Sequence, residues 1–161
     1  MLKYSIFFRP KYIFIIYYNL MKRVYIDGIF DLFHRGHLES FYKAKNCIDN
    51  EEIYLIVGVV NDKDAEEYKR LPIIKDEDRV EIVKSIQVVD DIIFPAPLII
   101  DKKFIDDNKI DLIVHGFLND QDYEKQKEFF KVPIELNKFK KIKYYDKIST
   151  SDIIKNIKEN Y

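Results

Sequence analysis

The sequence predicts an α/β fold, a Rossmann-like parallel five-stranded sheet with helices on both faces. From residue 23 onward, short runs rich in β-branched residues alternate with longer helical patterns, which is typical of a parallel sheet covered by helices. The run 53–60 is almost continuously apolar, as expected of a strand buried on both faces. A length of 161 residues with 47% apolar residues suits one compact domain with a single core.

The first half of the fold is predicted to contain two strands and two helices. Residues 24–26 are β-branched and aromatic and predict the first strand, and the apolar side chains of 36–48 recur at helical spacing. The run 53–60 is the second strand. A polar loop containing Pro72 leads to a helix over 77–87. The inner stripe of that helix is expected to comprise Val80, Ile82, Val83 and Ile86.

The second half continues the alternation. Residues 91–94 predict a third strand, which Pro95 ends because proline cannot donate to a sheet ladder. The next elements are expected to be a short helix at 101–108, a strand at 111–114, a helix at 123–130 and a strand at 142–145. A last helix follows, and Ser149, Thr150 or Ser151 can cap it.

Composition and charge exclude several classes of protein. The net charge of −1 gives no overall attraction to nucleic acid or to an anionic membrane, so neither is expected as a partner. The single cysteine, Cys47, has no internal disulfide partner and no neighbours at metal-ligand spacing. These features exclude a zinc site and predict a cytoplasmic protein.

Residues 1–20 differ from the rest of the chain. They contain three basic residues and no acid, and the apolar run 12–18 is too short to span a bilayer. Export is disfavoured because no small residues follow that run. This extension is therefore expected to be either an additional edge strand or the product of a start codon placed too early, with Met21 as the true first residue. Residues 21–161 are expected to form the domain.

The histidines and most glycines fall at predicted strand ends or helix starts. These residues are Gly28, His34, Gly36, His37, His115 and Gly116. In an open parallel sheet, ligands bind at the carboxyl ends of the strands, so these residues are expected to converge on one edge. Gly28 is expected either to adopt unusual dihedral angles or to let a ligand approach the backbone.

The segment 27–37, Asp-Gly-Ile-Phe-Asp-Leu-Phe-His-Arg-Gly-His, joins a strand to a helix N-terminus. Free N–H groups and the helix dipole at such a terminus favour phosphate, and two imidazoles lie beside it. A single histidine near a strand end is usually a satisfied polar residue. Here, however, the His-x-Gly-His pattern follows a strand, opens a helix and is preceded by Asp31. The chain has neither a P-loop nor a Gly-x-Gly-x-x-Gly fingerprint, which argues against NAD-type sites.

These residues resemble the cytidylyltransferases that make CDP-alcohols, above all the choline-phosphate and ethanolamine-phosphate enzymes, within the His-x-Gly-His nucleotidyltransferase superfamily. The resemblance covers residues 22–157 and implies that 21–161 is a cytidylyltransferase catalytic domain with the nucleotidyltransferase fold. The later matching blocks are Tyr54 to Val59 followed by Asp62, the Asp78-Arg79 pair, Val89-Asp90-Asp91, and Ile148 to Ile154.

The resemblance implies transfer of CMP from CTP, with Mg²⁺ on the triphosphate, to a phosphorylated alcohol in phospholipid synthesis, with release of pyrophosphate. The attacking phosphate monoester is already anionic, so positioning and charge stabilisation suffice. By similarity, the catalytic residues are His34, His37 and Lys69. The CTP-binding residues are Gly28, Ile29, Phe30, Asp31, Arg79, His115, Gly116, Ile148, Ser149 and Thr150. The acceptor-binding residues are Asp31, Asp62 and Tyr123.

Some of these residues have plainer alternative roles. Lys69 can be an ordinary loop charge. Arg79 lies in a stretch of alternating charge that suits a surface ion pair, whereas the resemblance makes it a phosphate contact or a fold-positioning contact. Ser149 and Thr150 would cap the last helix in any protein. One helix end can serve both as a cap and as a phosphate site.

The chain departs from the family pattern in three places. The family has Arg-Thr-Glu-Gly before Ile-Ser-Thr, whereas residues 144–147 are Tyr-Tyr-Asp-Lys, and a lysine at 143 or 147 cannot reproduce an arginine fork. The His115-Gly116 pair resembles the ethanolamine-phosphate enzymes. The sequence contains no tryptophan, the best ring for a quaternary ammonium, so phosphoethanolamine is favoured over phosphocholine.

Two further functions stay open, namely a glycerol-3-phosphate cytidylyltransferase and a nucleotide-binding protein without turnover. The resemblance also implies a homodimer. A long basic tail for membrane sensing is not expected, because the chain stops at Tyr161.

Overall fold

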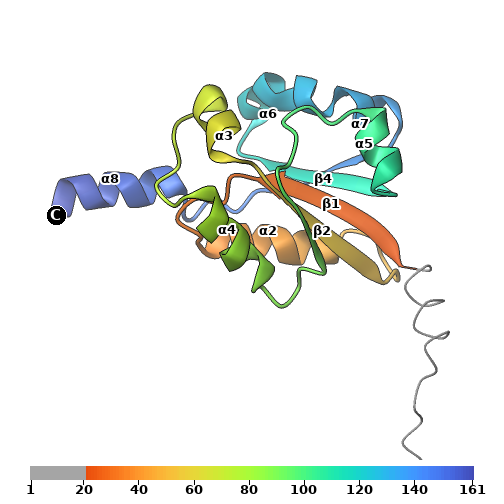
Figure 1. The fold of residues 1–161 in the computed structure, drawn as a ribbon, viewed down its shortest axis with the longest axis horizontal. Helices are drawn as coiled ribbons and strands as arrows, with labels where there is room; N and C mark the ends of the chain where they lie inside the picture. The colour runs from red at the N-terminus through yellow and green to blue at the C-terminus, as the bar shows by residue number, and fades with distance from the viewer. Residues whose placement is uncertain (1–20) are drawn as a thin grey trace, which may run out of the picture.

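A computed structural model describes residues 21–161 of the chain (Figure 1). The predictions for residues 1–20, an additional edge strand or a misplaced start, lie outside the described residues. Within the described part, no helix is long and apolar enough to cross a bilayer.

The centre of the fold is a parallel sheet of five strands. In chain order they are β1 (Lys22–Gly28), β2 (Ile53–Val59), β3 (Asp91–Ile93), β4 (Leu112–Phe117) and β5 (Phe139–Lys143). They lie in the order β3-β2-β1-β4-β5, and every pairing is parallel. The order reverses beside β1, where successive connections leave in opposite directions along the sheet. The predicted five-stranded α/β fold is confirmed.

Helices cover both faces of this sheet (Figure 1). One face packs against α2 (Arg35–Lys45) and α4 (Asp76–Lys84), and the other against α5 (Lys102–Asp107), the 3₁₀ helix η1 (Lys127–Phe130) and α7 (Lys131–Glu135). Side chains alternate along β1 because successive strand residues point to opposite faces. Val24 and Ile26 enter the first core, and Tyr25 enters the second.

Two short helices lie beside the strand ends, and one helix extends from the body. The short ones are α3 (Asp62–Tyr68) and α6 (Asp120–Gln126). The last helix, α8 (Thr150–Asn160), projects away from the sheet in Figure 1 and has no buried residue. Its N-cap is Ser149, one of the three residues predicted for that role.

Four elements differ from the prediction, and one of them is α7, which lies where no helix was predicted. Helix α3 lies in the stretch predicted as a loop. The sequence did not indicate it because Ala65 is its one buried residue, so the helix has no apolar stripe. The Asn61 side chain starts α3 by accepting a hydrogen bond from the N–H of Asp64 at 2.7 Å. Strand β5 begins three residues earlier than predicted, and the helix predicted at 123–130 is divided into α6 and η1.

A close contact in the core links Tyr25 and Gly58 on neighbouring strands. Tyr25 is fully buried, and its hydroxyl has no hydrogen-bond partner among the described residues. Burial, and secondarily the charge of Asp27, raise the pKa of Tyr25 well above its usual value. A β-carbon on Gly58 would overlap this hydroxyl, so the glycine provides the space that the tyrosine fills.

We expect Gly58→Ala to destabilise the protein by about 1–3 kcal/mol, because the added methyl overpacks a closed core. In the Gly58→Ala/Tyr25→Phe double variant, part of this loss should be recovered. Removing the hydroxyl relieves the closest overlap, whereas ring carbon Cζ and the Ala96 β-carbon stay 2.7 Å and 2.9 Å from the added methyl. Tyr25→Phe alone should leave stability unchanged or raised, because it removes an unsatisfied buried polar atom. Urea unfolding of the three variants measures this. Equal losses in the single and double variants would contradict the overlap.

Candidate functional site

A cavity of about 780 Å³ lies at the carboxyl edge of the sheet, beside the ends of β1, β4 and β5. Most of the predicted site residues line it. They are Gly28, Ile29, Phe30, Asp31, His34, His37, Lys69, His115, Gly116, Ser149 and Thr150. The predicted residues that do not line it are Asp62, Arg79, Tyr123 and Ile148. This cavity therefore lies at the sheet edge where the sequence predicted the site, the carboxyl ends of the strands.

His34 and His37 lie one above the other at the start of α2. Their rings stack with centroids 3.8 Å apart and an interplanar angle of 22°. The Nδ1 atom of His34 accepts the Gly36 N–H at 3.0 Å, and the Nδ1 atom of His37 faces the His34 N–H at 3.4 Å. Because each Nδ1 serves as an acceptor, each neutral ring carries its proton on Nε2. The two imidazoles therefore cap the helix with one nitrogen and retain a donor on the other.

Both rings are held in the neutral form. Burial, followed by the neighbouring His34, lowers the pKa of His37 to about 3, with a smaller opposing effect from Asp31. Burial also lowers the pKa of His34, against the opposing charge of Asp152. A proton on either Nδ1 would oppose the backbone N–H that it now accepts. Near neutral pH, the pair consists of uncharged hydrogen-bond donors.

The backbone that leads to the histidines is strained at two side-chain-bearing residues. Phe30 and Leu32 have φ angles of 55° and 46°, on either side of Asp31. No glycine in the described part has a positive φ, so the prediction of unusual dihedral angles at Gly28 is wrong. Gly28 instead makes room for the Phe30 ring, 2.9 Å from where a β-carbon would lie. Strain of this kind is typical of functional sites.

Asp31 fixes the loop that carries Lys69. Its carboxylate is 3% exposed and accepts the Ile73 N–H at 3.0 Å and the Ile74 N–H at 2.9 Å. Arg70 Nη1 lies 3.3 Å from Asp31 Oδ2. The Asp31 side chain, predicted to bind CTP and the acceptor, is thus occupied by the loop. Lys69 lies close enough to His37 for its charge to help lower the pKa of that ring.

The start of α8 closes another side of the cavity. Thr150 Oγ1 donates to the Asp31 carbonyl at 3.0 Å and lies 3.5 Å from His34 Nε2. Ser149 Oγ donates to Asp152 at 2.6 Å and accepts the Asp152 N–H. Ile148 does not line the cavity, but its carbonyl lies 3.2 Å from where a β-carbon on Gly36 would be. Gly36 thus lets the two helix starts approach each other.

Asp27 is a cavity residue to which the sequence analysis gave no role. It is buried, and its Oδ1 lies 3.4 Å from Nδ1 of His115, outside hydrogen-bond geometry. Neither atom has a hydrogen-bond partner among residues 21–161. The His115 ring packs between Phe117 and Phe130, with centroids 4.8 Å from each. The signal available in the sequence was an acid directly before the glycine that ends a strand.

Arg79 and Asp62 form a buried network behind the cavity. Arg79 is fully buried and donates to the carbonyls of Ile74 and Val60, each at 2.9 Å, and to that of Ile29. Its Nη2 lies 2.6 Å from Asp62 Oδ1. The structure therefore gives Arg79 the fold-positioning contact, one of the three roles considered for it, and it pairs Asp62 with this arginine.

Tyr123 is covered by a lysine. The Lys141 ammonium lies 3.1 Å from the centroid of its ring, and Phe117 packs edge-on against it. The ring predicted to contact the acceptor therefore already holds a cation of this chain.

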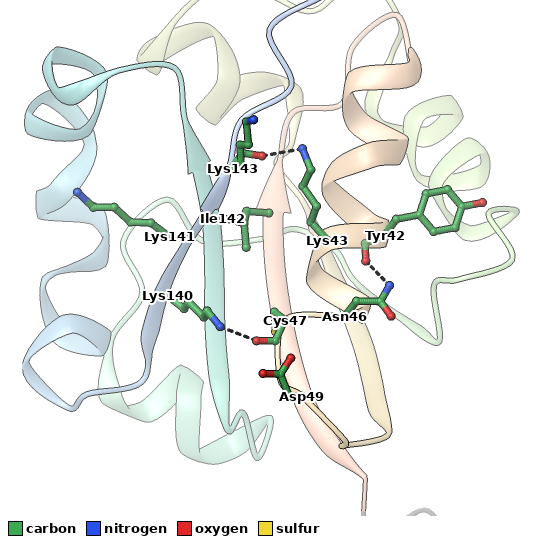
Figure 2. A pocket seen from close by; sticks show the side chains of 9 residues that line it. All are labelled: Tyr42, Lys43, Asn46, Cys47, Asp49, Lys140, Lys141, Ile142 and Lys143. Atoms are coloured by element: carbon green, nitrogen blue, oxygen red, sulfur yellow. Dashed lines mark hydrogen bonds between the residues drawn. The ribbon is translucent and has the colours of Figure 1, made fainter.

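A second cavity, of about 530 Å³, lies between α2 and β5 (Figure 2). It contains none of the predicted site residues. Two of its lysines bind backbone carbonyls, Lys43 that of Lys143 at 2.8 Å and Lys140 that of Cys47 at 2.6 Å. These bonds attach the edge strand to the helix, and the lysines of β5 disfavour pairing with another strand.

The part of the chain that the structure describes has no group of three His, Cys, Asp or Glu side chains that could hold a metal ion. Asp27 is the one carboxylate at the cavity with an unpartnered buried oxygen among the described residues. One such oxygen is not a magnesium site, since Mg²⁺ requires octahedral oxygen coordination. These side chains alone do not fit a resident Mg²⁺.

We expect Arg79→Lys to reduce the free energy of unfolding by about 3 kcal/mol, since a lysine keeps the charge but leaves buried carbonyls that Arg79 satisfies without a donor. A lysine also lacks the fork that reaches several acceptors. Chemical denaturation measures the change. Arg35→Lys is the matched control, because Arg35 is exposed and pairs with Glu39, so its loss should stay below about 0.5 kcal/mol. Equal stability of both variants would refute the role of Arg79.

The lowered pKa of His37 makes stability pH-dependent. In the unfolded chain, this residue is protonated below about pH 6.5, whereas in the folded chain it stays unprotonated down to about pH 3. Unfolding therefore becomes easier as the pH falls through this window. Between pH 7 and 5, wild type should lose up to about 2 kcal/mol more than His37→Gln. Urea unfolding at both pH values tests this, and no difference is expected between pH 7 and 8. Parallel curves for the two proteins across the window would contradict it.

Sequence relatives match the part of the chain that contains this site. The sequence profile of the cytidylyltransferase-like family matches residues 25–156. Choline-phosphate cytidylyltransferase 2 of Arabidopsis thaliana is 36% identical over 140 residues, which is 86% of this chain and 45% of that relative. Ethanolamine-phosphate cytidylyltransferase of Dictyostelium discoideum is 37% identical over 144 residues, or 86% of this chain and 38% of that relative. The chain thus spans less than half the length of either protein.

A solved structure has a similar fold. The lipopolysaccharide core biosynthesis protein from Thermoplasma volcanium GSS1 superposes with a TM-score of 0.60 at 28% identity, covering 78% of this chain and 99% of that protein. Residues 25–156, which the family profile matches, include both histidines, the Lys69 loop and the start of α8. The chain belongs to the cytidylyltransferase-like family.

Proposed function

We propose that this protein transfers CMP from CTP to a phosphorylated amino alcohol and releases pyrophosphate. The observation that carries the proposal is the stacked pair of neutral imidazoles, whose rings line the same cavity as Lys69. Relatives named choline-phosphate and ethanolamine-phosphate cytidylyltransferase support this reaction class.

The proposed reaction requires no nucleophile from the protein. A phosphate oxygen of the acceptor forms a bond to the α-phosphorus of CTP, and the bond from that phosphorus to the bridging oxygen breaks. The bond electrons leave with pyrophosphate. A phosphate monoester is largely dianionic at neutral pH, so no side chain has to remove a proton. The work of the protein is to align the two phosphates and to stabilise developing negative charge.

The side chains of the cavity suit that work. In this proposal, His34 and His37 donate from Nε2 to phosphate oxygens, and Lys69 supplies a positive charge beside them. Uncharged donors fixed by a helix cap need little reorganisation during the reaction. Mg²⁺ would accompany CTP as a counter-ion of the triphosphate, and no step assigned to this chain depends on it.

We assign the nucleotide to the helix starts and strand ends that border the histidines. The contributing residues would be Gly28, Ile29, Phe30, His115, Gly116, Ser149 and Thr150. The hydroxyls of Ser149 and Thr150 already serve as donors within the protein, so they would contribute mainly through oxygen lone pairs and nearby N–H groups.

The acceptor is proposed to be a primary amine, with phosphoethanolamine favoured over phosphocholine. The Asp27 carboxylate lines the cavity, and its buried Oδ1 has no hydrogen-bond partner among the described residues. A primary ammonium can donate a hydrogen bond to the part of this carboxylate that borders the cavity, and a trimethylammonium cannot. The alternative cation site at Tyr123 is covered by Lys141. Asp27 therefore replaces Asp62 and Tyr123 in the proposed acceptor site.

We further propose that the protein is a cytoplasmic homodimer without a nucleic-acid partner. The near-zero net charge supports the last point. Large apolar side chains exposed around the cavity, including Leu71, Ile73 and Leu118, offer surface for a second copy.

An assay with three different acceptors tests the proposal. The protein is incubated with CTP, Mg²⁺ and one of phosphoethanolamine, phosphocholine or glycerol-3-phosphate, and pyrophosphate release is measured. We expect the highest kcat/KM with phosphoethanolamine. Asp27→Asn should reduce this preference more than it reduces turnover with glycerol-3-phosphate, which has no cation. No turnover with any acceptor, while CTP still raises Tm, would instead favour a binding protein.

Three variants test the role of the histidines. His34→Ala and His37→Ala should each lower kcat by about 10²–10³, as expected when one preorganised donor is removed. His37→Gln retains an amide N–H donor and should recover part of the rate. Full activity in the alanine variants would remove the observation on which the proposal rests.

A further inference from the structure

Arg70 is an arginine at the cavity for which the reaction proposed above has no role. Among residues 21–161, it is the one arginine that lines the cavity. Arg35 pairs with Glu39 on the surface of α2. Arg79 is buried and is engaged by the Val60 carbonyl and the Asp62 carboxylate.

The backbone holds Arg70 beside Lys69. The N–H groups of both residues donate to the Ala65 carbonyl, at 2.9 Å and 3.0 Å, so both leave the end of α3 in a fixed position. The other end of the loop is anchored where Ile73 and Ile74 donate to Asp31. Two neighbouring cations are thus presented by a loop that is fastened at both ends.

The guanidinium is only lightly engaged. Its Nη1 lies 3.3 Å from Asp31 Oδ2, longer than the roughly 2.7–2.9 Å of a strong charge-assisted hydrogen bond. Asp31 already accepts two backbone N–H groups, so its anchoring of the loop does not depend on this contact. The Arg70 side chain is 32% exposed, and no other nitrogen of its fork has a hydrogen-bond partner in the described part of the chain.

We propose that Arg70 binds a phosphate group of the nucleoside triphosphate through both arms of its guanidinium, next to the Lys69 ammonium. This inference rests on the proposed function, because it names a phosphate-binding residue of the same cavity. A planar fork matches two phosphate oxygens at once, whereas a lysine offers one point of charge. The two cations therefore have different tasks: Lys69 supplies charge, and Arg70 fixes the orientation of the phosphate.

Calorimetric titration with CTP and, separately, with pyrophosphate tests the inference. The proteins are wild type, Arg70→Ala, Arg70→Lys and Lys75→Ala. We expect Arg70→Ala to weaken both Kd values by about 10–100-fold, the range for a lost charged hydrogen bond. Arg70→Lys should recover little of this, because an ammonium cannot form the fork. Lys75→Ala removes an exposed cation from the same loop, outside the cavity, and should bind as wild type does.

The outcomes separate this inference from the proposed function. If Arg70→Lys binds CTP as wild type does, charge alone suffices and the fork is refuted. If wild type turns over and both Arg70 variants match it in Kd, the inference fails and the reaction stands. If wild type binds neither ligand, both fail. A purely structural role would lower Tm with no change in Kd of the folded fraction, whereas we expect Tm to change by only a few degrees, since the contact with Asp31 is long and partly exposed.

Discussion

The architecture of the site depends on one buried guanidinium. Arg79 connects the segment after β1, the end of β2, the start of α3 and the loop before α4, through the carbonyls of Ile29 and Val60, the Asp62 carboxylate and the Ile74 carbonyl. Backbone carbonyls at strand ends have no ladder partner, and a buried one without a partner is costly. One side chain with five donors resolves several such groups at once. Arg79 thus holds in place the backbone of Ile29 and Val60, two residues that line the cavity.

At the start of α2, too, a few side chains satisfy backbone groups that would otherwise lack hydrogen-bond partners. A helix N-terminus has unpaired N–H groups, and these are often the atoms that bind phosphate. Here the Gly36 N–H donates to His34, so in the proposed function the imidazole Nε2 would bind the phosphate in place of that N–H group. The strained backbone at Phe30 and Leu32 brings the chain into the geometry that permits this cap. In the proposed function, helix capping and phosphate binding would use opposite nitrogens of the same ring, and the cap requires that Nδ1 stay unprotonated.

The sequence was sufficient for the fold and for much of the cavity, and its failures have physical causes. His34 and His37 could be located because a strand end and a helix start fix where their side chains go. Arg79 was ambiguous because alternating charges on a helix normally indicate a solvated face, and only tertiary packing buries one of them. Helix α3 was missed because a polar helix with one buried alanine has no periodicity to detect. Asp27 drew no assignment because its importance lies in the absence of a hydrogen-bond partner among the described residues, which spacing cannot reveal.

The positions of two groups of the cavity bear on the proposed acceptor. Lys69 and Arg70 lie on the loop beside the paired histidines, whereas the Asp27 carboxylate lies beside His115 of β4. A phosphorylated amino alcohol has the complementary arrangement, with a dianionic phosphate at one end and an ammonium at the other. Binding it in the reverse direction would bring its phosphate against the buried carboxylate, which is electrostatically unfavourable. In the proposed complex, this arrangement would therefore favour one orientation, in which the nucleophilic oxygen faces the histidines. An uncharged alcohol in place of the amine could still donate a hydrogen bond to Asp27 but would leave the buried carboxylate without a counter-charge. The carboxylate that would orient the amine is therefore expected to favour it over acceptors that lack a cation.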